Sequence, residues 1–187
     1  MSWKKVIGLM LVLLSVQAAA QRVAVKTNLL YLAAATPDLG AELVVGERTS
    51  LSLSAFGSYS PYWRDRSLEG QPTSFLAVQP EFRYWFNGRP LTRFYAGVYG
   101  LAAAYDFPFR EVVHKGTAAG AGLTVGYVVN LGKRLNLELS TGSGLLFYWG
   151  KRHAGEEGVT SQDTLPDTHG YKLAPAKLGV SLVYILK

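Results

Sequence analysis

The chain has 187 residues and no cysteine, and its 19 lysines and arginines against 13 aspartates and glutamates give a formal net charge of +6. This length suits one domain, and the lack of cysteine excludes disulfides and lipid attachment through a thiol. The bases are scattered along the chain rather than grouped, which argues against a nucleic-acid partner.

The N-terminal segment has the three parts of a secretory signal peptide. Two lysines are followed by the apolar run 6–14 and by three alanines before Gln21. The apolar run is shorter than the about 20 residues that a membrane-spanning helix needs. We therefore expect residues 1–20 to be a cleaved signal peptide and residues 21–187 to form the exported domain.

Beyond this segment the hydrophobic pattern repeats every two residues, which is typical of strands, and clusters of turn-forming residues separate the repeats. Several segments are as long as the about 9–11 residues of a tilted transmembrane strand. We predict eight strands, over 22–35, 39–46, 49–59, 74–87, 92–104, 117–130, 134–148 and 173–186.

The connections between these strands alternate in length. Short periplasmic turns and long extracellular loops give outer-membrane barrels the same asymmetry. The first outer connection, around Thr36, is a short exception. We expect short turns at 46–49, 87–91 and 131–133, and long loops at 60–73, 105–116 and 150–172.

The segment VQPEFRYWF at 78–86 shows how the two faces of a strand differ. Side chains alternate between the faces, so Phe82 and Tyr84 share one face while Glu81 and Arg83 share the other. Across the eight strands the polar face collects three bases and three acids: Lys26, Arg83, Lys177, Glu42, Glu81 and Glu138.

An eight-stranded barrel has an interior just wide enough for side chains to fill. Buried charges must be paired, so we expect these six residues to form an internal ion network, with inward glycines making room for their long side chains. We predict an all-β fold, an eight-stranded antiparallel up-and-down transmembrane β-barrel with a polar filled interior and no pore of significant size. Pro80 should cause either a bulge or a local break in the strand ladder.

Two further groups of residues follow from the same pattern. Four inward apolar residues should form small plugs near the ends: Val44, Leu146, Val183 and Ile185. Aromatic residues near both strand ends should form the two belts that membrane interfaces favour. The belt near the short turns contains Trp85, Phe86, Phe94, Tyr95, Tyr127 and Tyr184, and the belt near the long loops includes Tyr105, Phe147, Tyr148, Trp149 and Tyr171.

Four blocks carry a resemblance to a known family: KTNLLYLAAATPDLGAEL at 26–43, VQPEFRYWF at 78–86, GYVVNLGKRLNLE at 126–138 and KLGVSLVYILK at 177–187. Together they resemble an uncharacterised domain-of-unknown-function family of small Gram-negative outer-membrane proteins. The resemblance implies an outer-membrane barrel-like domain, similar in architecture to the small OmpA and OmpX barrels. It also implies a link to surface adhesion, because some members are encoded beside fimbrial components. The resemblance brings no catalytic residues.

Loops on a rigid scaffold often carry binding, so we expect a structural or surface-binding role through the outer loops. Candidate binding residues in the first long loop are Tyr62, Trp63, Arg64 and Arg66. Expected partners are outer-membrane lipids, lipopolysaccharide, the barrel-assembly machinery and a surface or fimbrial protein. We expect localisation in the cell outer membrane.

The histidines and carboxylates of the long loops show no metal-ligand spacing, and we expect no metal, cofactor or enzymatic activity. Two alternatives remain open. The first is an outer-membrane lipid-modifying enzyme, an acyl hydrolase or transferase, which would need a nucleophile such as Ser140 or Ser143 with His153 as the base. The second is a soluble lipocalin-like carrier, which would have an apolar lumen and a polar exterior.

Overall fold

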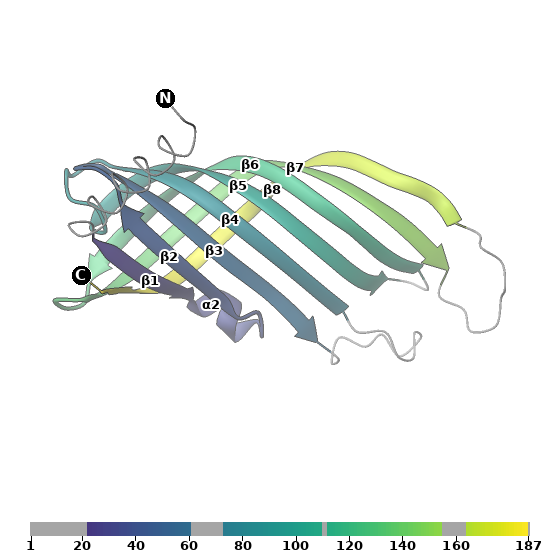
Figure 1. The fold of residues 1–187 in the computed structure, drawn as a ribbon, viewed down its shortest axis with the longest axis horizontal. Coiled ribbons are helices and arrows are strands. Elements are labelled where there is room, and N and C mark those ends of the chain that lie inside the picture. Colours follow the sequence, from purple (N-terminus) through teal and green to yellow (C-terminus); the bar gives the residue numbers. More distant parts are fainter. Residues whose placement is uncertain (1–21, 61–72, 110–111, 155–163, 187) are drawn as a thin grey trace, which may run out of the picture.

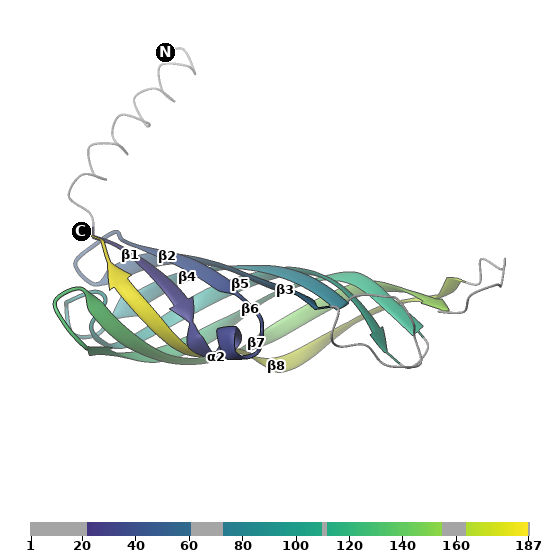
Figure 2. The ribbon, with the colours of Figure 1, turned by 90° about the horizontal axis from the view of Figure 1, so that it is seen from below.

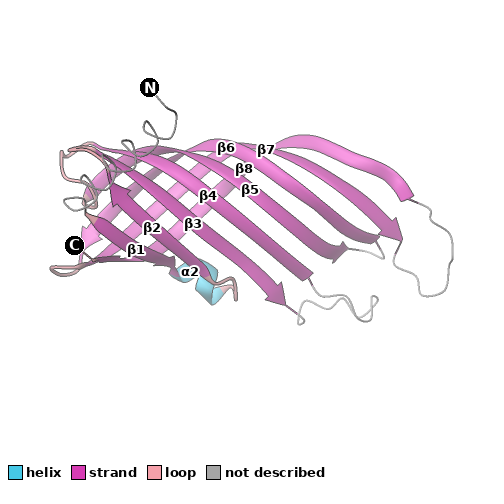
Figure 3. Ribbon diagram, viewed as in Figure 1, coloured by secondary structure: helices cyan, strands magenta, loops and turns pink. Residues whose placement is uncertain are grey.

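The computed structural model describes residues 22–60, 73–109, 112–154 and 164–186. They form eight antiparallel strands that close into a barrel, with β1 to β8 in chain order around the wall and one short helix, α2 (Figures 1 and 3). The predicted all-β, eight-stranded antiparallel barrel is confirmed. The strands are β1 Val23–Asn28, β2 Asp38–Val44, β3 Thr49–Ser60, β4 Thr73–Trp85, β5 Arg93–Phe109, β6 Val112–Asn130, β7 Leu135–Ala154 and β8 Thr164–Ile185.

The barrel closes where β1 pairs with β8. Ala24 lies opposite Ile185, and Asn28 lies opposite Ser181, in an antiparallel ladder. The start of β1 and the end of β8 therefore lie at the same end of the barrel as the connections β2–β3, β4–β5 and β6–β7 (Figure 1). We call this end the short-turn end. The predicted signal peptide lies outside the described residues.

The first strand is shorter than predicted, because α2 occupies Leu29–Ala33 where we expected strand to continue to residue 35. The side chain of Asn28 accepts a hydrogen bond from the Leu30 backbone N–H at 3.1 Å, as a helix N-cap does. Asn28 also bonds to β8, from its amide to the Leu178 carbonyl at 3.1 Å and from the Val180 N–H to its carbonyl oxygen at 3.2 Å. One side chain thus begins the helix and continues the β1–β8 ladder.

The remaining strands are longer than predicted at the end opposite the short turns. β5 and β6 pair up to Phe109 and Val112, so most of the expected long loop at 105–116 is strand. Continuing a ladder already in register satisfies backbone groups, and this outweighs the loop-like composition of the segment. Beyond α2, strands β3 to β8 run on without β1 and β2 (Figures 1 and 2). We call the fully closed part the closed half and the part beyond α2 the extended half.

Three prolines coincide with irregularities in the ladders. The β4–β5 ladder lacks the pairs of Gln79 and Pro80 while keeping its register, which is the local break predicted for Pro80. In the β7–β8 ladder, two register shifts each set two residues of β8 against one of β7. Pro166 and Pro175 lie within these shifts. Proline cannot donate to a ladder and is found at such bulges.

The two faces of the wall differ as the alternation predicts. Large apolar residues point outward, and Leu39, Leu123 and Leu178 expose 69%, 68% and 60% of their surface. Inward positions hold the charged residues and several glycines. The glycines make room mainly for tyrosines rather than for long charged chains, since a Cβ on Gly126 would lie 2.4 Å from the Tyr95 ring. Among the described residues, no helix has the length and hydropathy needed to cross a membrane.

Candidate functional site

The six charged residues predicted for the interior lie together inside the closed half. They come from β1, β2, β4, β7 and β8. Five of them are buried, the Lys177 side chain is 10% exposed, and the Arg83 side chain is completely inaccessible to solvent. The alternation of side chains places Lys26, Glu42, Glu81 and Arg83 on inward positions. Ser52 of β3 pairs with Glu42 of β2 on one side and with Glu81 of β4 on the other, so the two glutamates lie at the same height in the barrel.

Arg83 is the centre of this ion network. Its Nη1 donates to Glu42 Oε2 at 2.7 Å and to Glu138 Oε2 at 2.8 Å. Its Nη2 donates to Glu81 Oε2 and to Glu138 Oε1, both at 2.9 Å. The two bonds to Glu138 form the bidentate pair that the planar guanidinium favours. One arginine therefore neutralises and orients three carboxylates.

Two lysines and one tyrosine complete the network. The ammonium group of Lys177 donates to Glu81, and that of Lys26 lies 3.5 Å from Glu42 Oε2. The Tyr95 hydroxyl donates to Glu138 Oε1 at 2.7 Å, while its ring lies under the Arg83 guanidinium at 4.4 Å. Three bases thus meet three acids, and the balance limits the cost of burying charge.

An apolar plug lies between the ion network and the short-turn end. Its buried members are Ala24, Trp85, Leu91, Tyr95, Val128 and Val183, with Val44 and Ile185 packed against them. The indole N–H of Trp85 donates to Ser50 at 2.8 Å, and the Ser50 hydroxyl donates to Glu42 at 2.6 Å. Plug and network are therefore one connected unit.

The plug contains three of the four apolar residues predicted to fill the ends, and it contains two residues that we misplaced. Trp85 and Tyr95 were expected in an outward aromatic belt, but both have no exposed surface. The error has a simple cause, because Trp85 shares its parity with Glu81 and Arg83, and parity decides the face. Position near a turn does not decide it. Leu91, in a left-handed backbone conformation with φ 67°, was also missed.

A small polar cavity of about 20 Å³ adjoins the network on the side away from the plug. It is lined by residues that include Lys26, Gln79, Lys177 and Tyr31. The Gln79 amide nitrogen has no hydrogen-bond partner among the described residues. A polar site of this size has room for about one water molecule.

The extended half has an aromatic inner face. Tyr31 of α2 packs on Phe56 with ring centroids 5.1 Å apart, and Phe56 packs on Phe75 at 6.3 Å. Farther along, the Lys172 ammonium lies 5.6 Å from the centre of the Tyr148 ring. Tyr148 was expected in the outer belt but occupies an inward position, opposite Gly170. By contrast, Phe147, Trp149 and Tyr171 point outward as predicted.

The candidates for binding and catalysis are not brought together in the described part of the chain. Tyr62, Trp63, Arg64 and Arg66 lie outside the described residues. Ser140 is buried on the inner face of β7, whereas Ser143 is exposed on the outer face.

The histidines lie in strands rather than in the loops where we expected them, with His114 in β6, His153 in β7 and His169 in β8. Within the described segments, no three His, Asp or Glu side chains are grouped so that they could hold a metal ion. Among the described residues, the interior network is therefore the most organised set of polar side chains.

Comparison with known proteins identifies a family. A family model described as a protein of unknown function, DUF3575, matches residues 6–186. No curated protein matches the chain, and no solved structure matches it either.

Proposed function

The chain belongs to the DUF3575 family of proteins of unknown function, and we propose that it is an outer-membrane β-barrel of a Gram-negative cell, with a structural or surface-binding role. The observation that carries this proposal is the inverted distribution of polarity. The outer wall is apolar around the barrel, while the acids and bases lie inside. An apolar surface of this extent on a soluble monomer would favour aggregation, whereas acyl chains would cover it.

The aromatic residues and α2 support the same placement. At the short-turn end, outward rings follow one another from Tyr84 to Phe86, Phe94 and Tyr127, with centroids 5.4 to 6.3 Å apart. Rings of this kind favour the headgroup level of a bilayer. On the side where β1 and β2 are short, the exposed leucines of α2 extend the apolar surface.

We assign the role to binding at the outer loops rather than to transport or catalysis. The ion network and the plug occupy the interior of the closed half, and in an eight-stranded barrel this leaves little room among the described residues for the wide water-filled lumen of a porin. In this proposal the architecture is like that of the small OmpA and OmpX barrels, and the loops contact lipopolysaccharide or a surface protein. The fimbrial association implied by the family resemblance favours an adhesion-associated partner. The reverse polarity of a lipocalin-like carrier does not fit this wall.

Separation of inner and outer membranes after expression of the full chain tests the location. We expect the chain in the outer membrane, resistant to carbonate extraction, with a gel mobility that changes on boiling. Leu123→Asp places a charge on the outward wall, which costs less than the about 2–4 kcal/mol of an arginine or lysine near the middle of a bilayer but should still lower the inserted fraction. Asn130→Asp, at the exposed end of β6, is the matched control. Recovery of the wild-type chain as a soluble periplasmic protein would contradict the proposal.

A second experiment tests the role of the outer loops. Replacement of Tyr62, Trp63, Arg64 and Arg66 by serine should reduce retention of lipopolysaccharide or of a surface partner by intact cells. The control replaces Asn87 and Arg89, in the connection between β4 and β5 at the short-turn end, and should leave retention unchanged. Equal retention by both variants would exclude the first loop as the binding element.

A further inference from the structure

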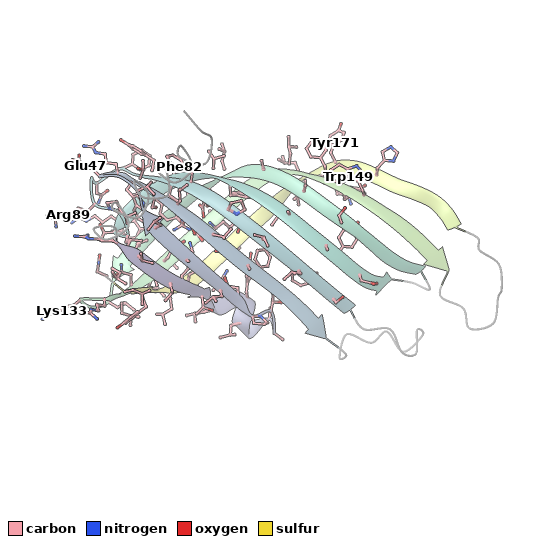
Figure 4. All side chains as sticks on the ribbon, viewed as in Figure 1. Glu47, Phe82, Arg89, Lys133, Trp149 and Tyr171 are labelled. Atoms are coloured by element: carbon pink, nitrogen blue, oxygen red, sulfur yellow. The ribbon has the colours of Figure 1, made fainter. Side chains whose placement is uncertain are left out.

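The short-turn end carries a ring of exposed positive charge. Its members are Arg22, Arg48, Arg89, Arg93, Lys133 and Arg134, and we call them the basic rim. Glu47 is the acidic residue among the described residues of the three turns. The described residues at this end therefore include six exposed bases and one exposed acid. Figure 4 shows Glu47, Arg89 and Lys133 at this end, outside the strands.

Backbone contacts spread the basic rim around the barrel rather than to one side. The Arg22 carbonyl accepts a hydrogen bond from the Val44 N–H at 2.9 Å, which joins the residue before β1 to the end of β2. The Arg48 carbonyl accepts from the Trp85 N–H at 2.8 Å, next to the β4–β5 turn. The Arg134 carbonyl accepts from the Ile185 N–H at 2.8 Å, which joins the β6–β7 turn to β8. Every connection at this end thus supplies at least one base.

The basic rim directly adjoins the outward aromatic row. The Arg48 guanidinium donates to the Tyr84 hydroxyl at 3.3 Å, and Tyr84 begins the series of rings that continues to Phe86 and Phe94. Arg93 directly precedes Phe94 in the sequence. If the aromatic row marks the edge of the apolar layer, the bases lie at the level of lipid phosphates. The interior cannot explain this charge, because its own acids and bases are already balanced.

We infer that the basic rim binds the headgroups of anionic phospholipids in the leaflet on the short-turn side. This inference rests on the proposed membrane location. A ring of bases that surrounds the barrel matches a continuous lipid surface better than it matches a compact protein partner, which would contact one side. Bases close to an anionic surface are attracted to it, and salt weakens the attraction within a Debye length.

The test uses the full chain reconstituted in phosphatidylcholine vesicles with and without phosphatidylglycerol. Spin-labelled lipids report which headgroup the protein retains at its surface. We expect phosphatidylglycerol to be preferred at low salt by up to about fivefold, and we expect high salt to remove the preference. The triple variant Arg48→Gln, Arg89→Gln and Lys133→Gln should lose it as well. Lys172→Gln, an exposed base of the extended half, is the control and should keep it.

The outcomes separate this inference from the proposed function. Insertion into both vesicles with equal retention of both lipids would overturn the inference and leave the membrane location intact. A preference that survives in the triple variant would also overturn it, as would stronger rim-dependent retention of soluble polyglutamate than of phosphatidylglycerol. Failure of the wild-type chain to insert into either vesicle would instead refute the membrane location, and the inference with it. The salt dependence of the wild type tests the inference even if the triple variant does not fold.

Discussion

In the closed half, eight strands pair around the whole circumference, and the lumen holds the ion network and the plug. In the extended half six strands continue, and among the described strands β8 has β7 as its neighbour along residues 164–174. The inner side chains differ accordingly. Arg83 and Tyr95 have no exposed surface, while Tyr148 and Lys172 are partly or fully exposed. Buried charge requires a closed wall, since every carboxylate needs donors on several sides.

The difference also explains how the open edge of β8 is tolerated. A long unpaired strand edge is a template for pairing with another chain, and proline and bulges oppose such pairing. Pro166 and Pro175 lie in the two bulges of β8 in the extended half. The closed half needs no such protection, because β1 covers Ser181 to Ile185.

The largest expected effect of a single change is at the centre of the closed half. Arg83→Met would leave Glu42, Glu81 and Glu138 with two lysines between them, so we expect the free energy of unfolding to fall by about 5 kcal/mol. Urea unfolding in detergent micelles measures this. Arg89→Met, on the exposed β4–β5 turn, is the matched control and should shift stability by less than about 0.5 kcal/mol. Equal unfolding midpoints for the two variants would show that the guanidinium does not hold the closed half together.

Removing one acid should cost less than removing the central base. Glu81→Ala leaves Lys177 without its carboxylate, but Arg83 keeps Glu42 and Glu138. We expect a loss of about 3 kcal/mol, since one buried charge loses its partner. Glu47→Ala removes an exposed carboxylate and serves as the control in the same unfolding assay. A wild-type midpoint for Glu81→Ala would contradict the network.

The alternation of side chains was sufficient to predict the number of strands, the barrel and the six interior charges. The same alternation places Trp85 and Tyr95 inside, and the prediction of an outward position was wrong because proximity to a turn does not determine which face a side chain occupies. The start of α2 could not be read this way, because the contact that ends β1 joins Asn28 to Leu178, residues far apart in sequence. The full length of β5 to β8 was missed for a related reason. Pairing with a neighbouring strand overrides local composition.

Two glycine substitutions compare the halves directly. A Cβ at Gly126 would lie within 2.6 Å of three atoms of the Tyr95 side chain, and one at Gly170 would lie within 3.1 Å of three atoms of Tyr148. Tyr95 is buried and bonded to Glu138, so Gly126→Ala should destabilise the barrel by about 2 kcal/mol through overpacking. Tyr148 has room to move, so Gly170→Ala should cost less than about 0.5 kcal/mol.

The comparison uses the same unfolding assay, with Gly132→Ala as a reference, because nothing lies within 4 Å of a Cβ there. Equal losses at the two sites would mean that the extended half is packed as tightly as the closed half.

A smaller loss of global stability than that of Gly126→Ala is expected at Asn28, which lies at the boundary between the halves. Its side chain accepts from the Leu30 N–H and bonds to both Leu178 and Val180 of β8. Asn28→Ala removes the helix cap and the side-chain hydrogen bonds from Asn28 to β8, so we expect the free energy of unfolding to fall by about 1 kcal/mol. The local effect should be clearer, because the Val180 amide loses its acceptor and should exchange its hydrogen faster, while the amides of β6 exchange as before. Asn87→Ala, on an exposed turn, is the control. An unchanged rate of hydrogen exchange at the Val180 amide would mean that the wall remains closed at this level without the Asn28 side chain. The boundary between the halves would then depend on the packing of α2 against β8.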